Sequence, residues 1–542
     1  MIILAAKKKN YVEGAAILAV TLVIVKILGF LFKIPLANIL DDRALADFNV
    51  SYNVYALLLT ISTSGVPVAI SRLISESNSL GRVNQAKRVF SVSMPAFCII
   101  GAVCALVTIV FSRQIADFML TEGAGPSIAL LGLAVFFCCV VSVYRGYSQG
   151  HEDMVPTSVS QVVEVVFKLV FGLGLSIVFV KFGMNSDMVA AGAIAGAVIG
   201  VGINIPLLAW FKKRAEKKNS YNLVETDKSV MSRKDTLKEI FRITIPMTLS
   251  SSLLSIITLI DTKVVRSQLA NSLGLSPAAV DAEYGVFSKA HYIFNLPSSL
   301  IVSISVSIVP AIAAAVAIKK YHDSAEVMST GLKIMNLFAL PMGVGMCVLA
   351  NPIYNVFYWD GRANGPLVLS IMGIASYFVC FQLVSTALVQ ASGFEKIALF
   401  SMPAGSLIKM FINWKLVGMP QFGILGAPIS TLVCYLLISL FNMIGLMRKV
   451  PEKPKLGPAF IKPLICSGVM GACAWGVYGL LTKIGGGYLI SGRLPMAIAL
   501  CISIVIAVIV YGVMVIFTGT LTRADMQLVP KGDKIANILK LK

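Results

Sequence analysis

Charged side chains interrupt a long apolar stretch of this sequence in an arrangement that can bind ions. The segment "VVEVVFKLVFG", residues 162–172, carries Glu164 and Lys168 among apolar residues. In a helix, residues four apart share a face, so these two side chains can form an ion pair. A lysine in such a place can also attract an anion, and the glutamate can hold the lysine until the anion replaces it. The spacing therefore predicts a Glu164–Lys168 ion pair that supports a cationic binding site.

Further cations lie in the other apolar stretches and outnumber the acids there. A lysine or arginine near a helix end can extend to the lipid headgroups, which accounts for Arg72 and Lys263 and is plausible for Lys33. It does not account for Lys26 and Lys168, which lie near the middle of their stretches. Ionisable residues within a membrane span usually face the protein interior or water. We therefore predict a water-filled cavity for an anionic substrate, lined by Lys26, Lys33, Arg72, Arg145, Lys168, Lys289, His291 and Lys409.

Asp261 is the lone acid deep in the second half of the chain. It can serve as a partner for Lys263 or Lys409, or as a coupling site for sodium or a proton. Asn413 can supply a further oxygen, the donor that hard cations prefer. The ten cysteines all fall in apolar stretches and the three histidines are scattered, so no metal spacing is present. Beyond Na+ or H+ as a coupling ion, we predict no cofactor.

The elements that must position these residues are membrane-spanning helices. The 542 residues are 57% hydrophobic and only 13% charged. Apolar runs of about 20 residues, each long enough to cross a bilayer as a helix, follow one another along the chain. The runs do not alternate, which argues against a β-barrel. The fold class is therefore predicted as an all-α polytopic membrane protein with fourteen spans. They lie near 14–37, 53–75, 90–112, 126–148, 156–180, 188–211, 243–265, 289–315, 332–352, 366–389, 397–418, 422–446, 459–482 and 494–518.

The distribution of basic residues predicts the orientation. The formal net charge is +20. Most of the Lys and Arg residues lie in alternate loops, on the side that holds both ends of the chain. This is the positive-inside bias, so both termini are expected in the cytoplasm. The same distribution makes nucleic-acid binding by the basic loops a poor explanation of the charge.

An internal repeat indicates two bundles. "ISTSGVPVAIS" (61–71) recurs as "ISVSIVPAIAA" (304–314), and the residues around Lys168 align with those around Lys409. We predict a six-helix bundle over 1–215, a basic cytoplasmic loop over 216–240 and a second six-helix bundle over 241–450. Residues 451–542 add two charge-poor helices and a cytoplasmic tail. Both bundles begin on the same side, which is typical of transporters that rock parallel repeats around a central substrate.

One glycine pattern predicts packing. In "AGAIAGAVIGVG", Gly192, Gly196 and Gly200 are four residues apart and share one helix face. Small residues at this spacing let two helices approach closely in a membrane.

Motifs of soluble enzymes are not found in the sequence. It contains no GxxxxGK phosphate loop, no HExxH and no GxSxG. We therefore predict that the protein is not an enzyme. With no ATP-binding domain in the sequence, transport is expected to be passive or driven by an ion gradient or the membrane potential.

The segments "VKILGFLFKIPLA" in the first span and "SGVPVAISRLISE" in the second resemble the MOP exporter superfamily. Its polysaccharide-biosynthesis branch of Gram-positive bacteria, with the MurJ-like lipid II flippases and the stage V sporulation protein B group, is the most similar part. The resemblance implies a multi-pass protein of the bacterial cell (plasma) membrane. The resemblance implies a V-shaped helical bundle with a cationic central cavity and a hydrophobic groove made by the two extra helices. It implies that Lys26 matches a basic residue of the family, and that Lys289 or His291 replaces a family arginine. It also places Asp261 where some members bind a cation.

The predicted function is therefore a flippase. By alternating access it would move lipid II, an undecaprenyl-pyrophosphate-linked peptidoglycan precursor, to the outer leaflet. Its partners would be this lipid-linked oligosaccharide, the membrane lipid and cell-wall synthesis enzymes. The alternatives are an exporter of another polyprenyl-linked polysaccharide, a MATE-type cation or drug antiporter, and a scaffold for wall synthesis. A vegetative and a sporulation role both remain open.

Overall fold

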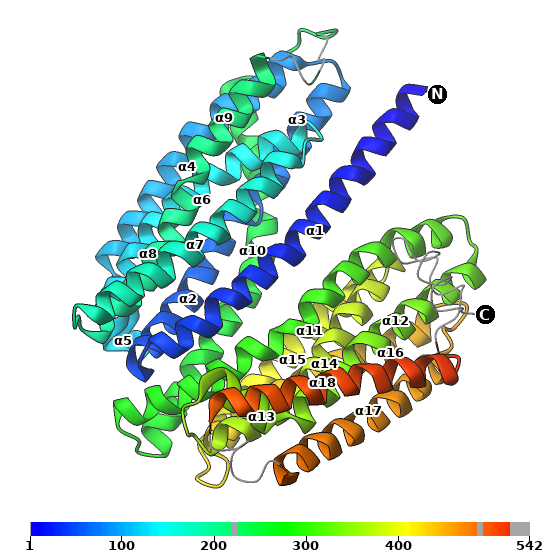
Figure 1. Ribbon diagram of the computed structural model, residues 1–542. Helices are drawn as coiled ribbons and strands as arrows, with labels where there is room; N and C mark the ends of the chain where they lie inside the picture. Colours follow the sequence, from blue (N-terminus) through cyan, green and yellow to red (C-terminus); the bar gives the residue numbers. More distant parts are fainter. Residues whose placement is uncertain (1, 218–220, 222–224, 485–491, 521–542) are drawn as a thin grey trace. The chain divides into compact units, whose positions relative to one another are not determined.

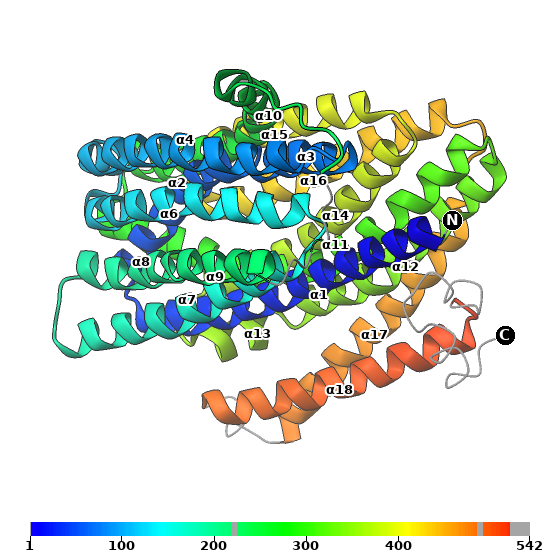
Figure 2. The ribbon, with the colours of Figure 1, turned by 90° about the horizontal axis from the view of Figure 1, so that it is seen from above.

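The protein is helical throughout the part that the structure describes. The computed structural model describes residues 2–217, 221, 225–484 and 492–520, and within these ranges the chain forms helices and turns and no strand. The helices divide between two compact units, the first covering 1–267 and 276–282 and the second covering the rest. Figures 1 and 2 show that the long helices of each unit run side by side. The all-α prediction is confirmed.

Unit 1 contains ten α-helices and one 3₁₀ turn among its described residues. They are α1 (Ile2–Ile39), α2 (Asp42–Thr63), α3 (Val66–Ser79), α4 (Val83–Val110), α5 (Ser112–Phe118), η1 (Glu122–Ala124), α6 (Gly125–Gly150), α7 (Val155–Lys181), α8 (Ser186–Gly202), α9 (Asn204–Lys217) and α10 (Arg233–Ser267). In this unit α7 packs against α8 and α1, and α6 packs against α4 and α8.

Unit 2 contains the remaining described elements. They are η2 (Gln268–Ser272), α11 (Pro277–Ala317, whose first turns belong to unit 1), α12 (Tyr321–Val348), α13 (Ala350–Tyr358), α14 (Asn364–Ala391), α15 (Glu395–Leu416), η3 (Gly423–Leu425), α16 (Gly426–Lys449), α17 (Leu456–Ile484) and α18 (Arg493–Phe517). Helix α17 packs against α12 and α18.

Twelve helices of the described part are long and apolar enough to cross a membrane. They match predicted spans 1 to 6 and 9 to 14. Predicted spans 7 and 8 fall on α10 and α11, which are continuous helices but are not among the twelve. The multi-pass membrane character is confirmed, whereas the count of fourteen is not. The predicted cytoplasmic tail after residue 520 lies outside the described residues.

The second predicted span is not one helix. Helix α2 ends at Thr63 and α3 begins at Val66, with Gly65 between them and Pro67 in the first turn of α3. A Cβ atom at Gly65 would lie 2.6 Å from the carbonyl oxygen of Thr244 and 2.8 Å from Oγ1 of Thr248. The glycine therefore allows α10 to pass close to the break, and α10 packs against both α2 and α3.

The end of the basic loop is bound to unit 1. Residues 225–231, which we call the strap, lie along the turn between α3 and α4. The backbone N–H of Thr226 donates to the carbonyl oxygen of Gly81 at 2.9 Å, and Arg82 Nε lies 2.5 Å from Asp227 Oδ2. Arg88 Nη1 donates to the carbonyl oxygen of Met231 at 2.8 Å. Packing therefore joins the strap and α10 to unit 1, whereas the repeat places α10 at the start of the second bundle. The repeat-based boundaries stay a prediction.

Candidate functional site

The glycine stripe of α8 brings α7 into backbone contact. A Cβ atom at Gly196 would overlap with the backbone of Gly172, and one at Gly200 would overlap with the carbonyl oxygen of Glu164. The predicted close helix contact is thereby confirmed. It also fixes the part of α7 that carries the intramembrane charges, because no side chain separates the two backbones there.

Glu164 forms its ion pair with Arg145 and not with Lys168. Arg145 Nη2 lies 2.9 Å from Glu164 Oε2, and Arg145 Nε donates to Ser160 Oγ at 3.0 Å. Asn204 Nδ2 donates to the same carboxylate oxygen at 3.4 Å. The predicted Glu164–Lys168 pair is therefore wrong. Helix periodicity places both residues on one face of α7, but α6 presents a guanidinium that can donate to both Ser160 and Glu164. Arg145 is consequently neutralised by an acid.

Lys168 lies instead among aromatic rings of α1 and α2. Its Nζ donates to the hydroxyl of Tyr52 at 3.0 Å and lies 4.3 Å from the centroid of that ring and 5.0 Å from the centroid of Phe32. Lys33 Nζ approaches the same tyrosine ring at 5.3 Å. No carboxylate of the described residues forms an ion pair with Lys168. We call Phe32, Lys33, Tyr52 and Lys168 the cationic–aromatic cluster.

The two remaining predicted cations of unit 1, Lys26 and Arg72, are exposed. Lys26 lies on α1, two turns before Lys33 and on the same helix face, and Arg72 lies on α3. Both can therefore meet solvent or headgroups without moving other side chains.

In unit 2, Lys289 is buried in an ion pair. Its side chain is 6% exposed, and its Nζ lies 2.8 Å from Asp360 Oδ2. The hydroxyl of Tyr354 donates to the same oxygen at 3.0 Å, and the hydroxyl of Tyr358 donates to the carbonyl oxygen of Lys289 at 2.8 Å. Burial alone would raise the pKa of Asp360, but the hydrogen bond and charge of Lys289 hold that pKa below its ordinary value. The positive charge of Lys289 is thus balanced within its own unit.

The other predicted residues of unit 2 lie on two helices. His291 on α11 is half-buried, with its ring centroid 5.0 Å from Phe294 and 5.8 Å from Phe287. Lys409 on α15 is half-buried and Asn413 is buried, with its Oδ1 accepting from Ser430 Oγ at 2.6 Å. Asp261 is buried on α10 of unit 1. The shared cation of Asp261 and Asn413 stays a prediction, and no cluster of three or more His, Cys, Asp or Glu within the described ranges is arranged to hold a metal.

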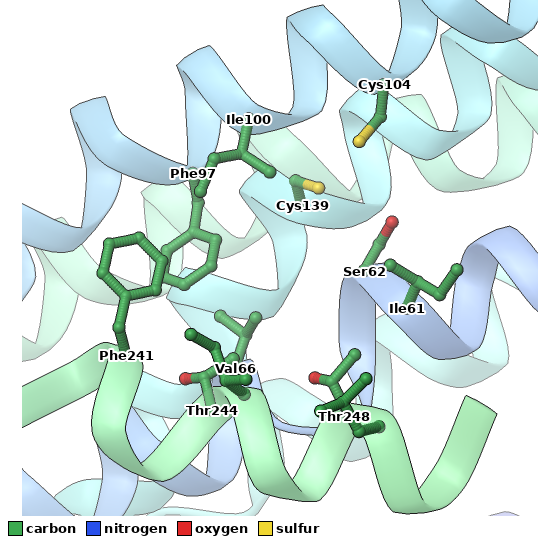
Figure 3. A pocket seen from close by; sticks show the side chains of 12 residues that line it. Ile61, Ser62, Val66, Phe97, Ile100, Cys104, Cys139, Phe241, Thr244 and Thr248 are labelled. Carbon is green, nitrogen blue, oxygen red and sulfur yellow. The ribbon is translucent and has the colours of Figure 1, made fainter. Parts of the chain in front are cut away.

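A cavity of about 190 Å³ lies beside the break between α2 and α3. Figure 3 shows Phe97, Ile100 and Cys104 of α4, Cys139 of α6, and Thr244 and Thr248 of α10 around it. The lining is almost entirely apolar and includes none of the predicted site residues. This cavity is therefore separate from the charged side chains that could bind an anion.

Sequence reasoning missed the partners of the two lysines. Tyr52 and Asp360 are 116 and 71 residues away from Lys168 and Lys289 along the chain. Periodicity within one helix carries no information on contacts at such separations. An aligned family, in which contacting positions vary together, is the signal that reveals such pairs.

The sequence and the fold both match known proteins. Residues 11–316 match the family model described as polysaccharide biosynthesis protein. The lipid II flippase MurJ of Bacillus subtilis (strain 168) is 24% identical over 528 residues, covering 94% of each chain. The stage V sporulation protein B of the same organism is 24% identical, covering 83% of this chain and 86% of that protein. A solved structure titled lipid II flippase MurJ, inward closed conformation, matches with a TM-score of 0.67 at 16% identity, covering 92% and 98% of the two chains.

The family match spans more than half of the chain, and the relatives extend it to nearly the full length. The helical fold, the intramembrane cations and these matches agree with one another. The chain belongs to the polysaccharide biosynthesis protein family.

Proposed function

We propose that the protein flips lipid II, moving its undecaprenyl-pyrophosphate-linked headgroup from the inner to the outer leaflet by alternating access. The observation that carries this proposal is the cationic–aromatic cluster, in which Lys33 and Lys168 flank one tyrosine ring. Similarity to a lipid II flippase over 94% of the chain supports the choice of cargo.

The pyrophosphate headgroup is the part of the cargo that the cluster fits. Ammonium groups donate strong, charge-assisted hydrogen bonds to phosphate oxygens. The ammonium group of Lys168 donates to the hydroxyl of Tyr52 at 3.0 Å, and an arriving anion can accept this hydrogen bond in place of the hydroxyl. Lys26 and Arg72 are exposed and add long-range attraction for an anion. The Arg145–Glu164 pair plays a different part, because it fixes α6 to α7 and so positions Lys168.

The polyprenyl tail requires an apolar surface. Helices α17 and α18 expose large apolar side chains, including Leu464, Leu480 and Val508 at 55%, 60% and 62%. Such side chains are compatible with lipid or a prenyl chain and costly in water. We place the tail along these helices. Coupling to Na+ or H+ through Asp261 and Asn413 belongs to the same proposal.

A second candidate is a flippase for another polyprenyl-linked glycan. The pyrophosphate and the prenyl tail are common to such lipids, so the cationic–aromatic cluster would serve both. The similarity to stage V sporulation protein B, at 24% identity, is nearly as extensive as the similarity to the lipid II flippase. A MATE-type exporter of cationic drugs fits less well, because two lysines at one ring repel a cation.

Complementation tests the cargo and the cluster together. Lys168→Ala, Lys33→Ala and the wild type are expressed in a strain depleted of its lipid II flippase, with membrane levels measured by blot. Lys181→Ala is the matched control, since Lys181 is exposed in the last turn of the same helix. We expect rescue by the wild type and the control, and failure of the two cluster variants at equal expression.

The outcomes distinguish a wrong assignment of the cargo from a wrong assignment of the headgroup site. If the wild type does not rescue, lipid II is the wrong cargo and another polyprenyl-linked glycan becomes the leading candidate. If all variants rescue equally, the cationic–aromatic cluster is not the headgroup site. A scaffold role would also make the cluster variants silent, and transport of labelled lipid II in proteoliposomes distinguishes it.

A further inference from the structure

A buried carboxylate in unit 1 takes no part in the cationic–aromatic cluster. Asp47, in the second turn of α2, is 1% exposed. Its Oδ2 accepts no hydrogen bond from any described residue. A buried ionised oxygen without a donor is costly, so the group must be neutralised by a proton or by a nearby charge.

A second carboxylate stands next to this oxygen. Gly123 of η1 lies between Asp47 and Asp187, and a Cβ atom at Gly123 would overlap with Oδ2 of Asp47 and lie 2.5 Å from Oδ1 of Asp187. Both oxygens are close to one point, so they are within about 5 Å of each other. Two carboxylates at this distance in a buried place do not both ionise readily, because their charges repel. Glycine is the residue that leaves them room to approach.

The arginines at this end of unit 1 are already engaged by other acids. Arg43 Nη2 lies 3.1 Å from Asp187 Oδ1, and Arg266 Nη2 lies 2.7 Å from Asp281 Oδ1. The charges that act on Asp47 are those of Asp187, Asp281, Arg43 and Arg266. Among these five groups, three acids therefore face two arginines, which leaves an excess of one negative charge.

The other charged groups near this end do not remove that excess. Asp41 accepts from Ser186 Oγ at 2.6 Å, and Lys263 lies over the ring of Phe118 at 3.1 Å. The remaining ones, on α2, α5 and η1, are Asp42, Arg113, Asp117 and Glu122. Of these, Arg113, Asp117 and Glu122 are exposed, so water screens them, and Asp42 is a further acid that adds negative charge near Asp281.

We propose that Asp47 binds a proton, and that Asp47 and Asp187 together form a protonation site at the end of unit 1 where α1 ends and α2 begins. The proton comes from water and joins a carboxylate oxygen of Asp47, which cancels the excess negative charge of the cluster. Because α2, η1 and α8 all supply parts of the site, loss of the proton would push these elements apart. The site does not depend on the identity of the cargo.

Infrared spectroscopy of the purified protein in nanodiscs tests the site without any cargo. A protonated carboxyl group has a C=O stretching band separate from that of a carboxylate. We expect this band in the wild type at pH 7 and its loss in Asp47→Asn, which keeps the shape of the neutral form. Asp117→Asn is the matched control, because Asp117 is an exposed acid of α5 at the same end, and it should keep the band.

A second variant keeps the test decisive if Asp47→Asn does not fold. Asp187→Asn removes the neighbouring like charge, so the Asp47 band should be weaker than in the wild type at the same pH. Absence of a band assigned to Asp47 in the wild type would overturn the proposal. Loss of the band on adding Na+ at constant ionic strength would also overturn it, by showing a metal cation at the site.

Discussion

Arg145 Nη2 lies 2.9 Å from Glu164 Oε2, and this contact ties α6 to α7 one helical turn away from Lys168. The two side chains are 17% and 26% exposed, so the pair is shielded from most of the solvent. Because Glu164 pairs with Arg145, Lys168 donates instead to the hydroxyl of Tyr52.

Removing either member of this pair should destabilise the protein. Glu164→Gln takes the charge away while keeping the shape, and Arg145 then lies half-buried without its acid. A hydrogen bond to a charged group contributes about 1.5–3 kcal/mol, so we expect a loss of about 2 kcal/mol and a lower Tm in detergent. The double variant Arg145→Gln/Glu164→Gln should be no less stable than the worse single variant, because the two changes break one interaction. Additive losses would contradict the pairing.

The hydroxyl and the ring of Tyr52 should contribute separately. Tyr52→Phe keeps the ring under Lys168 but removes the oxygen to which Lys168 donates, with an expected loss of about 1–2 kcal/mol. Tyr52→Leu also removes both cation–π contacts, which are each about 0.5–2 kcal/mol. Thermal unfolding should therefore order the proteins as wild type, Tyr52→Phe and Tyr52→Leu. Equal Tm values for the two variants would show that the ring adds nothing.

The contact between α7 and α8 should not tolerate a methyl group. Gly196→Ala places a Cβ atom onto the backbone of Gly172, and overpacking of this kind costs about 1–3 kcal/mol or more. Gly174→Ala on α7 is the matched control, since nothing lies within 4 Å of its Cβ position. The control should be neutral or slightly stabilising, because alanine favours the helix. Folded yield by size-exclusion chromatography and Tm measure the difference.

The Lys289–Asp360 pair should make stability depend on pH in the acid range. The pKa of Asp360 is lower in the folded protein than the ordinary value of about 3.9. Its contribution is therefore complete above that ordinary value and disappears as the pH falls through the lower folded value. Asp360→Asn should be less stable than the wild type by about 3 kcal/mol at pH 7, because Lys289 stays buried without its acid. The difference should shrink below about pH 4.

A double variant checks the origin of that effect. Lys289→Met/Asp360→Asn removes both charges and should recover most of the lost stability. A difference in stability between the wild type and Asp360→Asn that does not depend on pH would contradict the ion pair as its cause.

The sequence was most informative where an interaction is local. Twelve apolar spans and the glycine stripe could be read from composition and four-residue spacing, because both properties belong to a single helix. The partner of Glu164 could not be predicted in the same way. The four-residue spacing favoured Lys168 on the same helix, but Glu164 forms its ion pair with Arg145 on α6. The break at Gly65 had a signal in "SGVP", since glycine and proline together commonly interrupt a helix.

The strap has a practical consequence for exchanging parts between relatives. Its bonds to Gly81, Arg82 and Arg88 make the last residues of the linker a piece of unit 1. In a chimaera joined at residue 217, the strap and α10 would come from a different protein than the rest of unit 1, and these bonds would be lost. A cut after Ser267, where unit 1 first ends, would keep them. The segment to exchange as one piece is therefore about fifty residues longer than the first bundle that the repeat predicts.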